Sequence, residues 1–319
     1  MLSNLTISGC SSGYGAVYND GKLSVMNSTF SSNGGGAILN WGFGNSTGRP
    51  GGKLSVTNST FSGNGFAGDG AILNMRGTLS VTKSTFSGNS AGGRGGAIAS
   101  SCGGKLTVTN STFSGNSAGK DGGAIDTLSD INCATRLSRL TVKNTTFSGN
   151  SAGGRGGAID NGGPLTVTNS TFFDNSVSNG EGGAIANEPF SCRSQPCRAT
   201  VTNTIVANSP AGGNCFGPLT DGGHNLDDGA TCGFTAAGSL SNTDPQLDPT
   251  GLADNGGPTQ TIGIQAGSPA INAGDEKVCK SKLKNLDQRG YVRPGTGATN
   301  CSIGAYEFDS PGCPKGKCR

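Results

Sequence analysis

Residues 84–98 read STFSGNSAGGRGGAI, and nearly the same sequence returns at residues 111–125 (STFSGNSAGKDGGAI) and 145–159 (TTFSGNSAGGRGGAI). Looser copies flank these three, and in six copies a leucine precedes a phenylalanine by seven residues. The pairs are Leu23 and Phe30, Leu54 and Phe61, Leu79 and Phe86, Leu106 and Phe113, Leu140 and Phe147, and Leu165 and Phe172. Repetition at a fixed interval predicts a stack of similar units and argues against one rounded core.

The run between each leucine and its phenylalanine has the pattern of a β-strand. Residues 106–113, LTVTNSTF, alternate apolar with small polar side chains, as a strand with one buried face does. Glycine and asparagine divide each unit into strands too short for a series of antiparallel hairpins. The shortest repeat, about 25 residues, fits one turn of a three-strand solenoid whose turns stack about 4.8 Å apart. We predict an all-β parallel β-helix with about seven or eight regular coils over residues 1–208.

The composition excludes several classes of protein. The 319 residues include 58 glycines, and only 32% are hydrophobic and 13% charged, so a large aliphatic core is not expected. The repeat argues against disorder. A net charge of +3 without a basic run gives no support for nucleic-acid binding. No stretch approaches the roughly 18 to 20 apolar residues that a membrane-spanning helix needs.

An asparagine follows each phenylalanine by three residues. We expect these asparagines to occupy a bend of the coil, where their amides can hydrogen-bond along the stack as well as within their own turn. They are Asn33, Asn64, Asn89, Asn116, Asn150 and Asn175. The column therefore has a structural role in this interpretation.

A charged residue stands three positions before the alanine of Gly-Ala-Ile in four successive copies. The four are Arg94, Asp121, Arg155 and Glu181. Their alternating signs predict a surface ladder of salt bridges, each contributing roughly 0 to 1 kcal/mol. We expect the ladder to fix the register of the coils, because a slipped coil would bring like charges together.

Asp126 and Asp160 are the two catalytic candidates. Each follows the isoleucine of Gly-Ala-Ile, so they should stack on adjacent coils about 5 Å apart. Two carboxylates at that distance can share a cation or raise the pKa of one of them. Neighbouring coils carry Leu73, Ala99 and Ala186 there, with no basic residue in register. We therefore predict no enzyme, no cofactor and no metal centre, and leave calcium binding and polysaccharide cleavage open as alternatives.

Hydroxyl side chains point outward from the long strand of most units. They form the series Ser55 and Thr57, Ser80 and Thr82, Thr107 and Thr109, Thr166 and Thr168, and Thr200 and Thr202. Such an array resembles the surface of ice-binding β-solenoids, although Met26 and Lys143 interrupt it. Small β-branched polar residues are also what an exposed strand accommodates best. We prefer that structural interpretation and keep ice binding as a second alternative.

Three long insertions leave the coil at the same junction, at residues 41–52, 127–139 and 187–198. Insertions in repeat proteins gather on the working face, so any ligand is expected at this edge. Binding candidates are the aromatic and basic side chains there: Trp41, Phe43, Arg136, Phe190 and Arg193.

The cysteines indicate disulfides and an oxidising compartment, because only His224 could supply an imidazole for zinc. The proposed pairs, whose connectivity stays open, are Cys215 with Cys232, Cys279 with Cys301, Cys192 with Cys197, Cys102 with Cys133, and Cys313 with Cys318, with Cys10 or another cysteine left over. We expect His224 to be a turn residue. The first ten residues lack the pattern of a signal peptide, so we expect a truncated start or a non-standard gene model.

Residues 209–319 are rich in proline and glycine turns, and we expect irregular final coils and a cap that protects the open end. Asp287, Arg289 and Glu307 are expected to form a buried or half-buried ion pair across adjacent coils.

The repeat units FSGN…GGAI resemble the polymorphic outer-membrane-protein repeat, and the whole chain resembles bacterial right-handed parallel β-helix repeat proteins. The tail segments GGHNLDD, DPQLDPTGLADNGGPTQT, GSPAINAGD and DQRGYVRPGTGATNCSIGAYEF resemble choice-of-anchor Q proteins. These resemblances imply a right-handed helix and an exported, surface-linked protein. We expect an adhesive or structural role, with cell-surface glycans or surface proteins as partners and with end-to-end or side-by-side self-association open.

Overall fold

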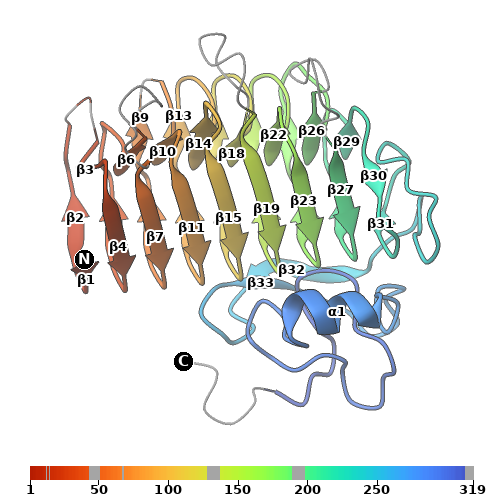
Figure 1. Ribbon diagram of the computed structural model, residues 1–319. Helices are drawn as coiled ribbons and strands as arrows, with labels where there is room; N and C mark the ends of the chain where they lie inside the picture. Colours follow the sequence, from red (N-terminus) through yellow and green to blue (C-terminus); the bar gives the residue numbers. More distant parts are fainter. Residues whose placement is uncertain are drawn as a thin grey trace.

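The computed structural model describes residues 1–11, 13, 15–42, 51–66, 68–127, 137–188 and 198–312. Over these residues the chain winds into a row of stacked coils (Figure 1). Three long parallel sheets of nine, eight and nine strands form the faces, and a short five-stranded sheet lies between two of them. The predicted right-handed parallel β-helix is confirmed.

Each face of the coil is one parallel sheet. Sheet A contains β1 (Leu2–Ser3), β4 (Lys22–Met26), β7 (Lys53–Thr57), β11 (Thr78–Thr82), β15 (Lys105–Thr109), β19 (Arg139–Lys143), β23 (Leu165–Thr168), β27 (Ala199–Thr202) and β30 (Thr220–Asp221). Sheet B contains β2 (Thr6–Ser8), β5 (Thr29–Ser31), β8 (Thr60–Ser62), β12 (Thr85–Ser87), β16 (Thr112–Ser114), β20 (Thr146–Ser148), β24 (Thr171–Phe173), β28 (Ile205–Ala207) and β31 (Leu226–Asp227).

The remaining strands complete each turn. Sheet C contains β3 (Val17–Asn19), β6 (Ile38–Trp41), β10 (Ile72–Met75), β14 (Ile98–Ser101), β18 (Ile125–Asp126), β22 (Ile159–Asn161), β26 (Ile185–Asn187) and β29 (Cys215–Phe216). The short sheet D contains β9 (Gly65–Phe66), β13 (Ser90–Ala91), β17 (Ser117–Ala118), β21 (Ser151–Ala152) and β25 (Ser176–Val177).

The core consists of columns of like side chains. Leucine and valine from sheet A, phenylalanine from sheet B and isoleucine from sheet C are buried along the rod. Six phenylalanine rings stack face to face, with neighbouring ring centroids 4.7 to 5.0 Å apart. The centroid spacing follows the coil spacing, because each ring comes from the same position of its coil.

The buried asparagine column at the bend is confirmed. The Nδ2 atom of Asn89 donates to Oδ1 of Asn116 on the next coil at 2.8 Å and to the Phe61 carbonyl at 3.0 Å. Asn116 repeats this pattern with Asn150 and Phe86. A second buried column, which the sequence analysis missed, joins Asn19, Asn40 and Asn74 at the end of sheet C, and Asn161 with Asn187 further along.

Residues 209–243 continue the coil and cover its end, with Cys232 and Phe234 packed on the core. Residues 244–312, which we call the flanking segment, then turn back and lie beside the coils from β15 onward (Figure 1). The segment contains β32 (Leu247–Ala253), β33 (Thr261–Ile264) and α1 (Glu276–Leu283). The expected end cap is therefore correct for the first part of the tail and wrong for the second.

The flanking segment binds sheet B and the corner between sheets A and B. Gln288 donates to the Thr112 hydroxyl and accepts from the Thr146 hydroxyl, and Asn144 donates to the Leu286 carbonyl. A second apolar core, which includes Ile205 of the coil and Ile303 of the segment, fills the space between them. The segment stays on the flank because these contacts satisfy polar groups of several coils at once.

We predict that Asn116→Ala lowers the free energy of unfolding by about 3 kcal/mol, because it leaves the buried amide and carbonyl partners on two neighbouring coils unpaired. Urea unfolding followed by circular dichroism measures the change. The matched control Ser55→Ala removes an exposed hydroxyl and should cost less than about 0.5 kcal/mol. Equal losses in the two variants would rule out a stabilising role for the column.

Candidate functional site

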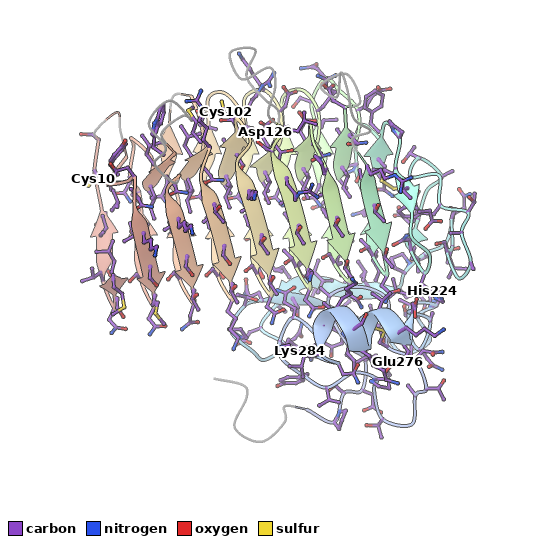
Figure 2. All side chains as sticks on the ribbon, viewed as in Figure 1. Cys10, Cys102, Asp126, His224, Glu276 and Lys284 are labelled. Atoms are coloured by element: carbon purple, nitrogen blue, oxygen red, sulfur yellow. A yellow bond between two sulfur atoms is a disulfide. The ribbon has the colours of Figure 1, made fainter. Side chains whose placement is uncertain are left out.

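The two predicted aspartates stack on the outer side of sheet C. Asp126 of β18 pairs in register with Asp160 of β22, as expected. Asp126 lies on the side of the coil away from the flanking segment (Figure 2). The side chains are not on an open surface, however, because Asp126 is 3% exposed and Asp160 is fully buried. These two residues therefore do not form a site on the outer face that is open to a substrate.

Glycine-rich loops fold back against this face of sheet C. Gly122 has φ +66°, and a Cβ atom there would lie 2.9 Å from the Asp126 Cα. Gly156 has φ +63°, and a Cβ atom there would lie 2.6 Å from the Asp160 backbone nitrogen. Only glycine combines this backbone conformation with so close an approach. Because Asp121 and Arg155 directly precede these glycines, the loops carry the charged column over the aspartates.

The charged column forms part of the expected ladder. Arg94 pairs with Asp121 at 3.3 Å, and the Asp121 carboxylate also accepts a hydrogen bond from the Arg155 backbone N–H at 2.9 Å. The expected pairing of Arg155 with Glu181 is wrong, since Arg155 forms its ion pair with Glu188. The Glu188 backbone N–H donates to the Asn161 carbonyl, so Glu188 is anchored at the buried end of sheet C, whereas Glu181 is exposed.

Members of the two columns, together with Glu188, thus form one charged cluster in which the carboxylates are buried and the two arginines are partly exposed: Arg94, Asp121, Asp126, Arg155, Asp160 and Glu188. Burial raises the pKa of Asp160 to about 7, and the nearby Asp121 carboxylate adds to the shift. The guanidinium groups of Arg155 and Arg94 and the Asn161 N–H act in the opposite direction. Neither Asp160 oxygen accepts a well-formed hydrogen bond from the described residues.

The cluster does not offer a complete metal site within the described part of the chain. Over these residues, three potential ligand groups come within 4.8 Å of one another only at Glu276, Cys279 and Cys301. The two cysteines there are bonded to each other, so they are not available as thiolates. Calcium binding at Asp126 and Asp160 stays a prediction.

Polar side chains cover the outer face of sheet A in register. Serine and threonine columns run through β4, β7, β11, β15, β19, β23 and β27, and most of these side chains reach solvent. Thr168 is an exception at 4% exposed. A column of basic residues at the start of several of these strands is a feature that the repeat does not single out, although in four copies a lysine or arginine directly precedes the leucine. The ice-binding alternative stays a prediction.

One of the five insertion residues singled out for binding can be placed. Trp41, at the end of β6, lines a hollow of about 200 Å³ together with Leu39 and Leu73 on the outer side of sheet C. Phe43, Arg136, Phe190 and Arg193 lie outside the described residues. The hollow is mostly apolar, since its other lining residues are Ile38 and glycines.

Several cysteine predictions can be compared with the structure. The disulfides Cys215–Cys232 and Cys279–Cys301 are confirmed, and Cys10 is free. Cys102 is disulfide-bonded, but its expected partner Cys133 lies outside the described residues. The expected pairs Cys192 with Cys197 and Cys313 with Cys318 also lie outside them.

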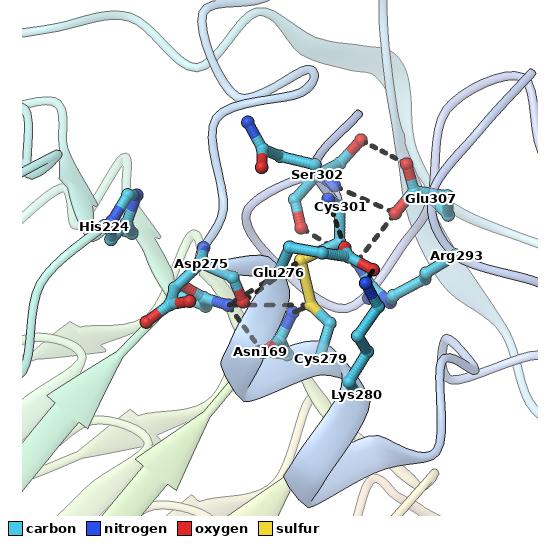
Figure 3. The surroundings of a disulfide bond; sticks show 12 residues. Asn169, His224, Asp275, Glu276, Cys279, Lys280, Arg293, Cys301, Ser302 and Glu307 are labelled. Carbon is cyan, nitrogen blue, oxygen red and sulfur yellow. Dashed lines mark hydrogen bonds and ion pairs between the residues drawn. A yellow bond between two sulfur atoms is a disulfide. The ribbon is translucent and has the colours of Figure 1, made fainter. Parts of the chain in front are cut away.

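The Cys279–Cys301 disulfide joins α1 to the last part of the flanking segment beside Asn169 of the coil (Figure 3). The buried pair Asp287–Arg289, at 2.7 Å, is confirmed, but it lies within the flanking segment and not across adjacent coils. Glu307 instead pairs with Arg293 at 3.1 Å.

His224 has φ +55°, and its Nδ1 atom lies 2.7 Å from the Ala273 carbonyl oxygen. These contacts are those of a turn residue that joins the coil to the flanking segment, as the sequence analysis expects.

A family model described as the Chlamydia polymorphic membrane protein (Chlamydia_PMP) repeat matches residues 83–101, 110–127 and 144–162. Three of the coils are therefore similar to repeats of this type. No curated protein and no solved structure matches the chain significantly. The repeats and the disulfides suggest a surface or extracellular protein. No helix in the described ranges is long and apolar enough to cross a membrane.

We predict that Asp160 makes stability depend on pH. Its pKa rises from 3.8 to about 7 on folding, so between these values the unfolded chain releases a proton that the folded protein keeps. The free energy of unfolding should therefore fall as the pH rises from about 4 to about 7. Asp160→Asn removes this contribution and should stabilise the protein at about pH 8 by on the order of 4 kcal/mol, with no gain near pH 3.

Urea unfolding across this pH range measures the difference in the free energy of unfolding between Asp160→Asn and the wild type. The exposed control Asp20→Asn should change stability by less than about 0.5 kcal/mol throughout. A gain from Asp160→Asn that does not grow with pH would contradict the prediction.

Arg155→Glu should lower the melting temperature, because it places a carboxylate near Asp121 and Glu188 and removes the ion-pair partner of Glu188, while the backbone N–H that Asp121 accepts from is kept. The expected loss is roughly 1–3 kcal/mol, since the arginine side chain is partly exposed. Lys277→Glu, a charge reversal at an exposed position of α1, is the control. An unchanged melting curve for Arg155→Glu would refute the register role of the ladder.

Proposed function

We propose that this chain is part of an exported, surface-associated β-helix that acts as an adhesive and structural rod and binds glycans or other surface proteins. The observation that carries the proposal is the outer face of sheet A, a flat polar surface that continues through seven strands in register. Hydroxyl groups at a regular spacing suit the recognition of a long polar partner, because each coil repeats the same donors and acceptors.

The comparison and the sequence both support a surface location. The polymorphic membrane protein repeats belong to a surface-associated class, and the disulfides suit an oxidising compartment. The resemblance of the tail to choice-of-anchor Q proteins supports the same assignment. Self-association through the ends or sides of the rod stays a prediction.

Polysaccharide cleavage is the second candidate function. It is favoured by Asp126 and Asp160, which stack in register, and by the Asp160 pKa of about 7, which suits a general acid. The burial of both carboxylates beneath the loops argues against catalysis, because a substrate must reach the acid. We therefore assign Asp126 and Asp160 to the structure of the cluster.

A glycan array combined with a reducing-end assay on uronate polymers distinguishes the two functions. We expect binding to one or more glycans without the release of reducing ends. The double variant Asp126→Asn with Asp160→Asn should bind as the wild type does. Cleavage by the wild type that this variant loses would establish the enzymatic alternative, and the absence of binding to glycans and surface proteins would refute the adhesive one.

A further inference from the structure

A column of basic side chains runs along sheet A at the first position of its strands. Lys22 pairs in register with Lys53, and Lys105 pairs with Arg139. Arg198 continues the column, because it directly precedes Ala199, which pairs with Leu165. All five side chains are exposed. Only Thr78 and Pro164 interrupt the series, which we call the basic column.

No acidic side chain of the strands from β4 to β27 neutralises this charge. Strands β4, β7, β11, β15, β19, β23 and β27 contain no aspartate or glutamate. No ion pair within the described residues involves a member of the basic column. Like charges placed directly opposite on neighbouring strands destabilise a sheet. The column therefore has an unfavourable self-interaction that an anionic ligand would relieve.

The basic column borders the hydroxyl face. A shallow hollow of about 470 Å³ spans β4, β7 and β11, and its lining includes Lys22, Lys53, Ser24, Ser55 and Ser80. Met1 also lines it, and most of the lined surface is apolar. Charge and hydroxyl groups thus face the same space. A ligand that carries both anionic groups and hydroxyls would find partners for each.

We propose that sheet A binds an acidic polysaccharide, whose carboxylate or sulfate groups pair with the basic column while its hydroxyls contact the serines and threonines. The chain would lie along the rod, perpendicular to the strands. One pyranose ring is about as long as the distance between coils, about 4.8 Å, so successive sugars can meet successive coils. This inference rests on the proposed function and narrows its ligand class.

A nucleic acid is the other class of linear polyanion whose negative charges could pair with the basic column. The sheet A strands between β4 and β27 contain no aromatic side chain on which bases could stack. The repeated hydroxyls suit a sugar polymer better, and nucleic acid is therefore a competing outcome of the test.

The test measures affinity for polygalacturonate and heparin by affinity electrophoresis, using the whole chain. The triple variant Lys53→Thr, Lys105→Thr, Arg139→Thr adopts the residue that the column already has at Thr78, so the strands should tolerate it. We expect it to weaken binding by roughly tenfold or more, and we expect added salt to weaken wild-type binding.

The control variant Lys120→Thr, Lys277→Thr, Lys282→Thr changes the net charge equally at exposed positions away from sheet A. It should stay within about twofold of the wild type. Circular dichroism checks that both variants fold. Polygalacturonate with fully methyl-esterified carboxylates is the matched ligand, and it should bind far more weakly than the free acid.

Equal losses in the two triple variants, equal binding of the methyl ester, or tighter binding of DNA or RNA would each overturn the proposal. If neutral glycans bind on the array and acidic polymers do not, only the acidic ligand class fails. If no glycan binds at all, glycan adhesion fails with it.

Discussion

The fold depends on register: each coil must pair its backbone with the next coil at the same position on every face. The strands of the coil have only two to five residues, so their backbone bonds alone oppose a one-residue slip weakly. The buried asparagines remove this freedom, because from Asn64 to Asn150 each amide donates to the next asparagine and to a phenylalanine carbonyl, as at Asn89. A slip would leave a whole column of buried amides unpaired, at roughly 1–3 kcal/mol each.

Register also places each side chain beside the equivalent side chain of the next coil. Whether this stacking stabilises the fold depends on the type of side chain. Stacked phenylalanines gain from this arrangement, because their flat rings fill the narrow core without gaps. Like charges stacked in this way repel each other, and the structure places charged residues in two different arrangements. In the loops, Arg94 and Asp121 alternate and attract each other. On sheet A, Lys22 faces Lys53 without compensation, and the column stays on the exposed face, where water and salt screen it.

The periodic part of the molecule could be predicted from the sequence, because each column involves a single repeat position. The charged cluster could not, since it joins positions from two columns: Gly122 and Gly156 turn the loops back so that Asp121 and Arg155 meet Asp160. The flanking segment was missed for a related reason. Its contacts with the coil join residues far apart in the sequence, as Gln288 and Thr112 are at a separation of 176 positions, and have no equivalent in the other coils.

The flanking segment makes coils that are alike in sequence differ at the surface. The threonine that begins a sheet B strand is half-buried at Thr29, Thr60 and Thr85. It is fully buried at Thr112 and Thr146, on the coils that the flanking segment covers. Sheet B is thus open only over the early coils, and the loops cover Asp126 and Asp160 on sheet C. Within the described residues, sheet A keeps exposed side chains from Lys22 to Arg198. Of the three long sheets, sheet A is therefore the one that stays open to a ligand spanning more than a few coils, so the position of the tail restricts where an extended partner can lie.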